Sequence, residues 1–96
     1  MYIKIHQFQD SQVVAICDEE LIGKKVTEGE LEINISERYY KGDKKSIEET
    51  KEIMKTAKNL NLVGEDTIKL AIELDLIEEK DILHIGGVEH AQIFSL

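Results

Sequence analysis

Apolar positions at the start of the chain follow the pattern of paired β-strands. β-branched and aromatic residues dominate residues 2–8, and a second apolar run, residues 12–17, follows a break at Asp10 and Ser11. This pattern predicts a β-hairpin. Residues 13–17 are apolar at consecutive positions, so the second strand is expected to be covered on both faces and to lie in the centre of its sheet.

The next segment changes from apolar runs to alternation. Asp18 is placed to cap a single helical turn that Gly23 closes, and residues 24–29 are interpreted as an irregular connection. Apolar and polar side chains alternate over residues 31–36, which predicts a strand with one face in water. The polar stretch over residues 37–45 is interpreted as a loop.

Two helices and a second hairpin are predicted in the second half. Ser46 and Glu49 have the spacing of a capping box, and an apolar stripe predicts a helix over residues 46–60. Residues 62–64 are interpreted as a turn into a second helix over residues 65–76. Residues 82–85 and 88–94 then form a hairpin around two glycines.

The turn of that last hairpin fixes its register. If Gly86 and Gly87 form a two-residue turn, Leu83 pairs with His90 and His84 pairs with Glu89. The two histidines then face opposite sides of the sheet and cannot share a metal ion.

Strands segregated from helices favour an α+β fold. We expect a two-layer sandwich in which a mostly antiparallel sheet of about five strands carries two helices on one face. Ninety-six residues fit one domain, residues 1–96.

Charge and cysteine content narrow the class of protein. Twenty acidic and twelve basic side chains give a formal net charge of −8, which disfavours broad binding to nucleic acid or to anionic membranes. The single cysteine, Cys17, cannot form an internal disulfide. No stretch is long and apolar enough for a signal sequence or a membrane span, so we expect a cytoplasmic protein with no membrane partner.

Catalytic chemistry has one candidate set, formed by Cys17 and Asp18 with the histidines His6, His84 and His90 elsewhere in the chain. The candidates selected from it are Cys17, Asp18 and His90. Together these residues could supply a nucleophile and a base. The simpler explanation is that Cys17 is a small core residue and Asp18 a helix cap. The chain has no CxxC or HxxxH spacing and no dinucleotide fingerprint, so neither a metal site nor a cofactor is predicted.

A binding candidate lies in the polar stretch, where basic and aromatic residues interleave. Cations can hold phosphates while a tyrosine stacks on an unpaired base, as in proteins that bind single-stranded RNA. The simpler explanation is a solvated loop with one tyrosine in the core. The residues concerned are Arg38, Tyr39, Tyr40, Lys41, Lys44 and Lys45.

Four sequence blocks together resemble one family. They are CDEELIGK at residues 17–24, YYKG at residues 39–42, NLVGED at residues 61–66 and GVEHAQIF at residues 87–94. They are similar to the archaeal domain-of-unknown-function family 424 over nearly the whole chain. The chain departs from that family at Glu89, where a proline often precedes the histidine.

The resemblance implies a cytosolic archaeal protein of two-layer α/β form, with a connection to translation. Mapped onto this sequence, it points to ten positions. They are Cys17, Asp18, Gly23, Lys24, Tyr40, Gly42, Gly64, Gly87, His90 and Gln92. Turns and caps account for many of them, whereas His90 and Gln92 share a strand face and are polar without an evident packing reason. We therefore count His90 and Gln92 among the predicted binding residues.

Three functional hypotheses follow. The favoured one is a noncatalytic binding module that contacts RNA, a ribonucleoprotein or a translation partner through residues 38–45, because no catalytic set is compact in the sequence. The first alternative is a small enzyme or ligand-binding protein with a pocket around Cys17, Asp18 and His90. The second is a homo-oligomeric structural subunit.

Overall fold

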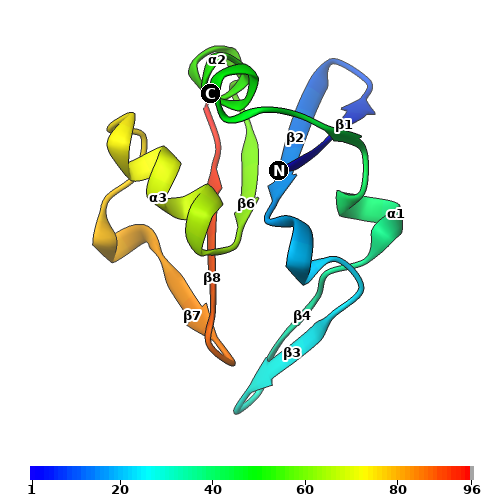
Figure 1. The fold of residues 1–96 in the computed structure, drawn as a ribbon, viewed down its shortest axis with the longest axis vertical. Coiled ribbons are helices and arrows are strands. Elements are labelled where there is room, and N and C mark those ends of the chain that lie inside the picture. The colour runs from blue at the N-terminus through cyan, green and yellow to red at the C-terminus, as the bar shows by residue number, and fades with distance from the viewer. Residues whose placement is uncertain (96) are drawn as a thin grey trace.

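A six-stranded sheet crosses the structure, which a computed structural model describes for residues 1–95 (Figure 1). Its strand order is β5-β1-β2-β6-β8-β7. The strands are β1 Tyr2–Phe8, β2 Ser11–Cys17, β5 Asp43–Lys44, β6 Leu60–Val63, β7 Leu83–Ile85 and β8 Val88–Ile93. Within the described residues, β2 and β6 pair in parallel and all other neighbours are antiparallel. The predicted α+β class with a mostly antiparallel sheet is therefore confirmed.

Short helices and a separate hairpin complete the fold. The helical elements are η1 Glu19–Leu21, α1 Glu37–Tyr40, α2 Ile47–Thr56, α3 Glu65–Glu73 and η2 Glu79–Asp81. A second sheet has two strands, β3 Lys25–Glu28 and β4 Leu31–Asn34, which project from the main sheet in Figure 1. No helix within residues 1–95 is long and apolar enough to span a bilayer.

Local signals predict several elements correctly. The first hairpin pairs Tyr2 with Cys17 through Phe8 with Ser11, and the Ser46 capping box is formed at the start of α2. The last hairpin has the predicted register, with Leu83 opposite His90 and His84 opposite Glu89. These features depend on neighbours in sequence, which is why the pattern alone specifies them.

Three segments form regular structure where the sequence predicts turns or a loop. Residues 24–29 contain β3, which pairs with β4, so the alternating strand lies outside the main sheet. Residues 37–45 contain α1 and β5 instead of a single loop. The turn predicted at residues 62–64 is wrong, because Leu60–Val63 is a buried central strand. Its partner β2 is more than forty residues away in the chain, so local pattern carries no sign of the pairing.

The sheet is packed differently on its two faces. One face lies against α2 and α3, where Ile16, Leu62, Met54 and Ile68 are buried in one apolar cluster. Burying each such side chain contributes about 1.5–3 kcal/mol. The opposite face is covered only in part, by α1 and the β3–β4 hairpin. Its apolar cluster contains Ala15, Cys17, Ile35, Tyr40, Val63 and Val88. Strand β2 is therefore buried on both faces, as predicted.

The parallel strands are joined at their carboxyl ends by Asp18. The N-cap of α3 is Gly64, which has no side chain that could accept from the backbone amides of the first turn. These amides have no partner within the helix. Asp18, the residue after β2, supplies the missing cap. Its Oδ2 accepts from the Asp66 amide at 2.9 Å, and its Oδ1 accepts from the Thr67 amide at 2.9 Å and from the Thr67 hydroxyl at 2.7 Å. The prediction that Asp18 caps the turn after β2 is wrong, because its side chain makes no capping bond there.

Gly64 is required by this junction for two reasons. Its φ of +111° is one that residues with side chains rarely adopt, and a Cβ would lie 2.5 Å from Asp18 Oδ2 and 2.7 Å from Oδ1. Any other residue would displace the carboxylate that caps α3. Asp18 is 2% exposed and Thr67 fully buried, so displacement would leave a buried charge without its partners.

We therefore expect Gly64→Ala to destabilise the protein by about 3 kcal/mol more than Gly23→Ala does. Gly23 is the matched control because its φ is also positive, at +88°, but a Cβ placed there would meet nothing within 4 Å beyond its chain neighbours. Gly23→Ala should cost only the left-handed backbone penalty, about 1–2 kcal/mol. Urea unfolding followed by circular dichroism measures both losses, and equal losses would contradict the role given to Asp18.

Candidate functional site

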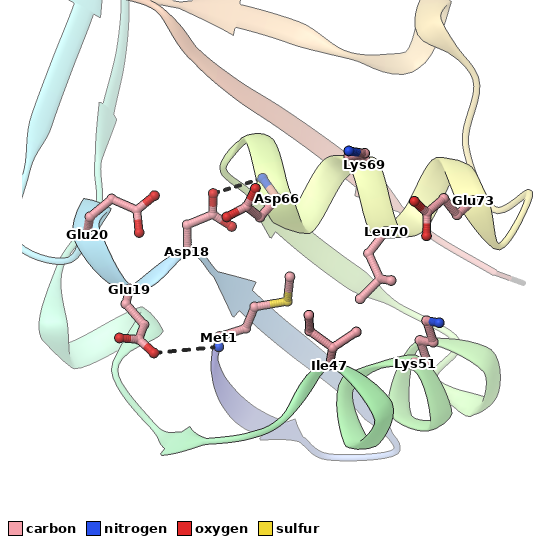
Figure 2. Close-up of a pocket in the computed structure, with 10 residues that line it drawn as sticks. All are labelled: Met1, Asp18, Glu19, Glu20, Ile47, Lys51, Asp66, Lys69, Leu70 and Glu73. Atoms are coloured by element: carbon pink, nitrogen blue, oxygen red, sulfur yellow. Dashed lines mark hydrogen bonds and ion pairs between the residues drawn. The ribbon is translucent and has the colours of Figure 1, made fainter.

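A hollow of about 430 Å³ lies beside the Asp18 junction, between η1, α2 and α3 (Figure 2). Leu70 of α3, Ile47 of α2 and Met1 form its apolar floor. Its charged lining residues are Asp18, Glu19, Glu20, Asp66 and Glu73, opposed by Lys51 and Lys69. The excess of carboxylates makes this hollow unfavourable for a phosphate-bearing ligand.

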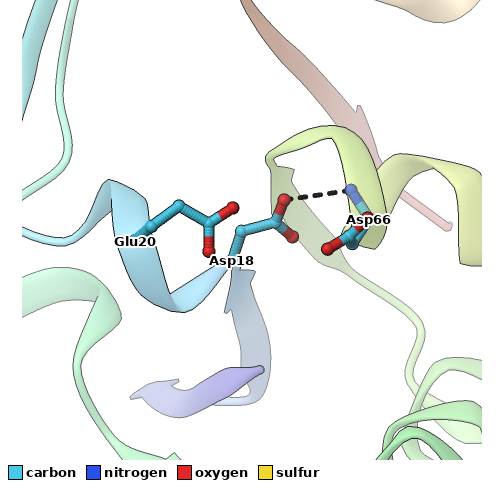
Figure 3. A group of neighbouring side chains, drawn as sticks. All are labelled: Asp18, Glu20 and Asp66. Carbon is cyan, nitrogen blue, oxygen red and sulfur yellow. Dashed lines mark hydrogen bonds between the residues drawn. The ribbon is translucent and has the colours of Figure 1, made fainter.

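Three carboxylates at the edge of this hollow lie close together (Figure 3). Oxygen atoms of Asp18, Glu20 and Asp66 lie within 4.8 Å of one another, and carboxylate oxygens are the ligands that hard cations prefer. Asp18 is already engaged by three donors from α3. Glu20 and Asp66 are exposed. A cation held here would depend mainly on those two side chains.

Cys17 has the environment of a core residue. Its side chain is fully buried, and Sγ donates to the Asp18 carbonyl at 3.2 Å. Burial, reinforced by the charges of Asp18 and Glu20, raises the pKa of the Cys17 thiol to about 12. The thiolate is the nucleophilic form of cysteine, so the geometry keeps Cys17 in its unreactive form at neutral pH.

The three catalytic candidates do not converge. Cys17 pairs with Val63 and Val63 pairs with His90, so Val63 separates the thiol from the imidazole in one row across the sheet. Two strand spacings amount to about 10 Å, which is beyond hydrogen-bond reach. The Asp18 carboxylate lies at the start of α3 instead.

His90 belongs to a polar network at the centre of the sheet. Asn61 Oδ1 accepts from the Tyr40 hydroxyl at 2.9 Å and from His90 Nε2 at 3.1 Å. Burial raises the pKa of the Tyr40 hydroxyl and lowers the pKa of His90. Tyr40 and His90, predicted as binding residues, thus fasten α1 to the sheet. Gln92, two residues further along β8, is exposed.

The basic residues predicted as one loop are dispersed. Lys41 forms an ion pair with Glu37 at 3.8 Å, and Lys44 forms one with Glu19 at 3.1 Å. Lys45 lines a different hollow, beside Ile3 and Ile53. Of the basic and aromatic residues of the predicted binding loop, Arg38 and Tyr39 line a hollow together with Lys4, His6 and Phe8 of β1.

Arg38 and Tyr39 belong to a surface that the sequence analysis does not predict. We call it the aromatic patch, and it consists of Lys4, His6 and Phe8 of β1 with Arg38 and Tyr39 of α1. These residues and Ser36 line a hollow of about 520 Å³. The signal present in the sequence is that Lys4, His6 and Phe8 alternate along one strand and therefore share a face.

Ring stacking organises the aromatic patch. The His6 and Tyr39 rings are stacked with centroids 4.2 Å apart, and Phe8 lies 6.3 Å from His6 in a nearly parallel orientation. His6 Nε2 donates to the Tyr39 carbonyl at 2.9 Å, and Lys4 Nζ donates to the Arg38 carbonyl. Phe8 is 53% exposed. The patch thus offers a fixed aromatic surface beside two cationic side chains.

The sheet face that carries this patch has no carboxylate of its own. Among the six strands of the main sheet, acidic side chains occur only at Asp43 and Glu89. Asp43 pairs with Ile3, and Glu89 is two residues from Ala91 in β8, so each shares a face with a residue of the helix-covered cluster. Both acidic residues therefore lie on the helix-covered face. Although the chain has a net charge of −8, the two acidic residues of the main sheet lie on the face opposite the aromatic patch.

Fold and site together define a small α+β protein with an aromatic, weakly cationic surface on the uncovered part of its sheet. The chain belongs to the family described as "Protein of unknown function (DUF424)", which matches residues 6–96. It is also similar to a solved structure, "Crystal structure of an uncharacterized conserved protein from Methanopyrus kandleri". The TM-score is 0.81 at 27% identity, covering 99% of this chain and 92% of that chain. No curated protein matches the chain.

The buried imidazole of His90 should make stability depend on pH. Within residues 1–95, His90 Nδ1 is buried without a hydrogen-bond partner, and burial lowers the pKa of His90 below 6.5. The unfolded chain therefore binds a proton more readily, so the stabilisation is complete above pH 6.5 and is lost as pH falls through the lower folded pKa. Relative to His90→Gln, the wild-type protein should lose unfolding free energy between pH 8 and pH 5.

The control for this measurement is His84→Gln, which removes an exposed histidine from the same hairpin. Urea unfolding at both pH values gives the comparison. If the wild-type protein and His90→Gln keep a constant difference in unfolding free energy, the assignment of a buried neutral imidazole is wrong.

Proposed function

We propose that this chain is a noncatalytic module that binds single-stranded RNA through the aromatic patch, in the cytoplasm of an archaeon. The observation that carries the proposal is the stacked His6–Tyr39 pair with exposed Phe8 beside it. Unpaired bases stack on aromatic side chains, and each stacked base contributes about 1–3 kcal/mol to binding. A ribonucleoprotein or translation partner would be recognised through the same unpaired bases.

The charges around the patch support an RNA strand over a duplex or a purely electrostatic ligand. Lys4 and Arg38 supply cations beside the rings, and the strand residues of this face supply no carboxylate. The remaining surface is strongly acidic, which opposes tight wrapping of a phosphate backbone. Affinity must therefore come mostly from stacking, with a small number of phosphate contacts and a shallow dependence on salt.

The other two hypotheses lack a comparable observation. Burial raises the pKa of the Cys17 thiol, and Val63 lies between Cys17 and His90 in the sheet. The enzyme hypothesis therefore lacks a nucleophile and a base in contact with each other. The homo-oligomer stays a prediction that light scattering would check.

Two variants test the RNA-binding proposal. Phe8→Ala should weaken binding of a labelled single-stranded RNA by about 5- to 100-fold, because a stacked base loses its platform. Arg38→Gln should weaken binding and reduce the slope of log Kd against log salt by about 1, because one phosphate contact is lost. Fluorescence anisotropy at several salt concentrations measures both effects.

The chain offers a matched control for each variant. Ile5→Ala removes a side chain of β1 that is 56% exposed but points to the opposite face from Phe8. Lys55→Gln removes an exposed cation from α2. Neither should change RNA binding. Equal effects of Phe8→Ala and Ile5→Ala, or equal binding of duplex and single-stranded RNA, would overturn the proposal.

A further inference from the structure

A second exposed aromatic ring lies on the same sheet face as the aromatic patch. Phe94 is 67% exposed and follows β8, where Val88, His90 and Gln92 alternate toward this face. The Ser95 amide donates to Asn59 Oδ1 at 3.2 Å, which keeps the chain beyond β8 alongside the start of β6. Figure 1 places the β1–β2 turn and the end of β8 at the same end of the sheet.

A second hollow accompanies this ring. It measures about 260 Å³ and is lined by Asp81, Leu83, His90, Ala91, Gln92 and Phe94. Leu83 is 51% exposed, and Gln92 adds an exposed amide. The Asp81 carboxylate, which accepts from the Glu78 amide at 2.9 Å, disfavours a phosphate here. The hollow therefore suits a base, with the sugar-phosphate backbone directed away from it.

The distance between the two sites follows from the strand order. Strands β1, β2, β6 and β8 are consecutive neighbours, so Phe8 and Phe94 are separated by three strand spacings, about 14 Å across the sheet. The register places Phe94 level with His6, so the two phenylalanine rings are also offset by two residues, about 7 Å, along the strands. Between them, Val13 is half-buried on β2, and α1 and the hairpin cover the other end of the face. Ser11 and Asn59 also lie on this part of the face, which has uncharged strand residues and no strand carboxylate.

We infer that the bound RNA strand crosses this sheet face from the aromatic patch to a second base-binding position formed by Phe94 and the Asp81–Gln92 hollow. The inference rests on the proposed function, since it extends the same ligand across the sheet. Its physical basis is two exposed rings, each beside a hollow, at the same end of one face. It implies a minimum ligand length, because one or two nucleotides can occupy the aromatic patch alone.

Ligand length separates this inference from the proposed function. For a single-stranded octanucleotide, Phe94→Ala should weaken binding by about 5- to 100-fold, as Phe8→Ala does. For a dinucleotide, Phe8→Ala should weaken binding and Phe94→Ala should not. Phe94→Tyr keeps a stacking ring and should bind as the wild-type protein does, whereas Phe94→Leu keeps bulk without a ring and should resemble Phe94→Ala.

Ile72→Ala is the control, because Ile72 is exposed on α3, which packs on the opposite face of the sheet. If Phe8→Ala weakens octanucleotide binding and Phe94→Ala does not, the second position is refuted while RNA binding by the patch stands. If the wild-type protein binds neither oligonucleotide at low salt, the proposed function fails and the second position fails with it. Thermal melts of each variant establish that the comparison is made on folded protein.

Discussion

The carboxylate of Asp18 is the interaction on which the arrangement of the sheet depends. Asp18 follows β2 directly, and its carboxylate caps the first turn of α3, where it accepts from three donors of Asp66 and Thr67 and is 2% exposed. A charged acceptor at the start of a helix is stabilised by free amides and by the helix dipole. The close approach of Gly64 makes this possible. The one parallel pair within residues 1–95 is thereby closed at its carboxyl ends.

This closure determines which surfaces are left for binding. With α2 and α3 fixed against one face, the other face is covered only by α1 and the β3–β4 hairpin. The Tyr40–Asn61–His90 network holds α1 in place, and that position brings Tyr39 onto His6. Residues without ligand contacts of their own therefore shape the aromatic patch. Truncating Tyr40 or Asn61 would disturb the patch indirectly.

The parts of the fold that follow from the sequence are those specified by near neighbours. The run Val13 to Cys17, the Ser46 capping box and the Gly86–Gly87 turn each carry their own pattern. Strand β6 and the role of Asp18 do not, because their partners are distant in the chain. The site shows the same division. Arg38 and Tyr39 are recognisable from composition, whereas Lys4, His6 and Phe8 become part of it only when α1 folds back on β1.

The cap that Asp18 provides for α3 also has a kinetic consequence. The acceptor and its donors are 48 and 49 residues apart, so the first turn of α3 lacks its cap until that long loop closes. Non-local closures of this kind slow folding. Helix α2 carries its own capping box and can form early, whereas α3 gains its final stability when β6 docks beside β2. The Asp66 and Thr67 amides would then acquire protection from hydrogen exchange in the same step as the central strands.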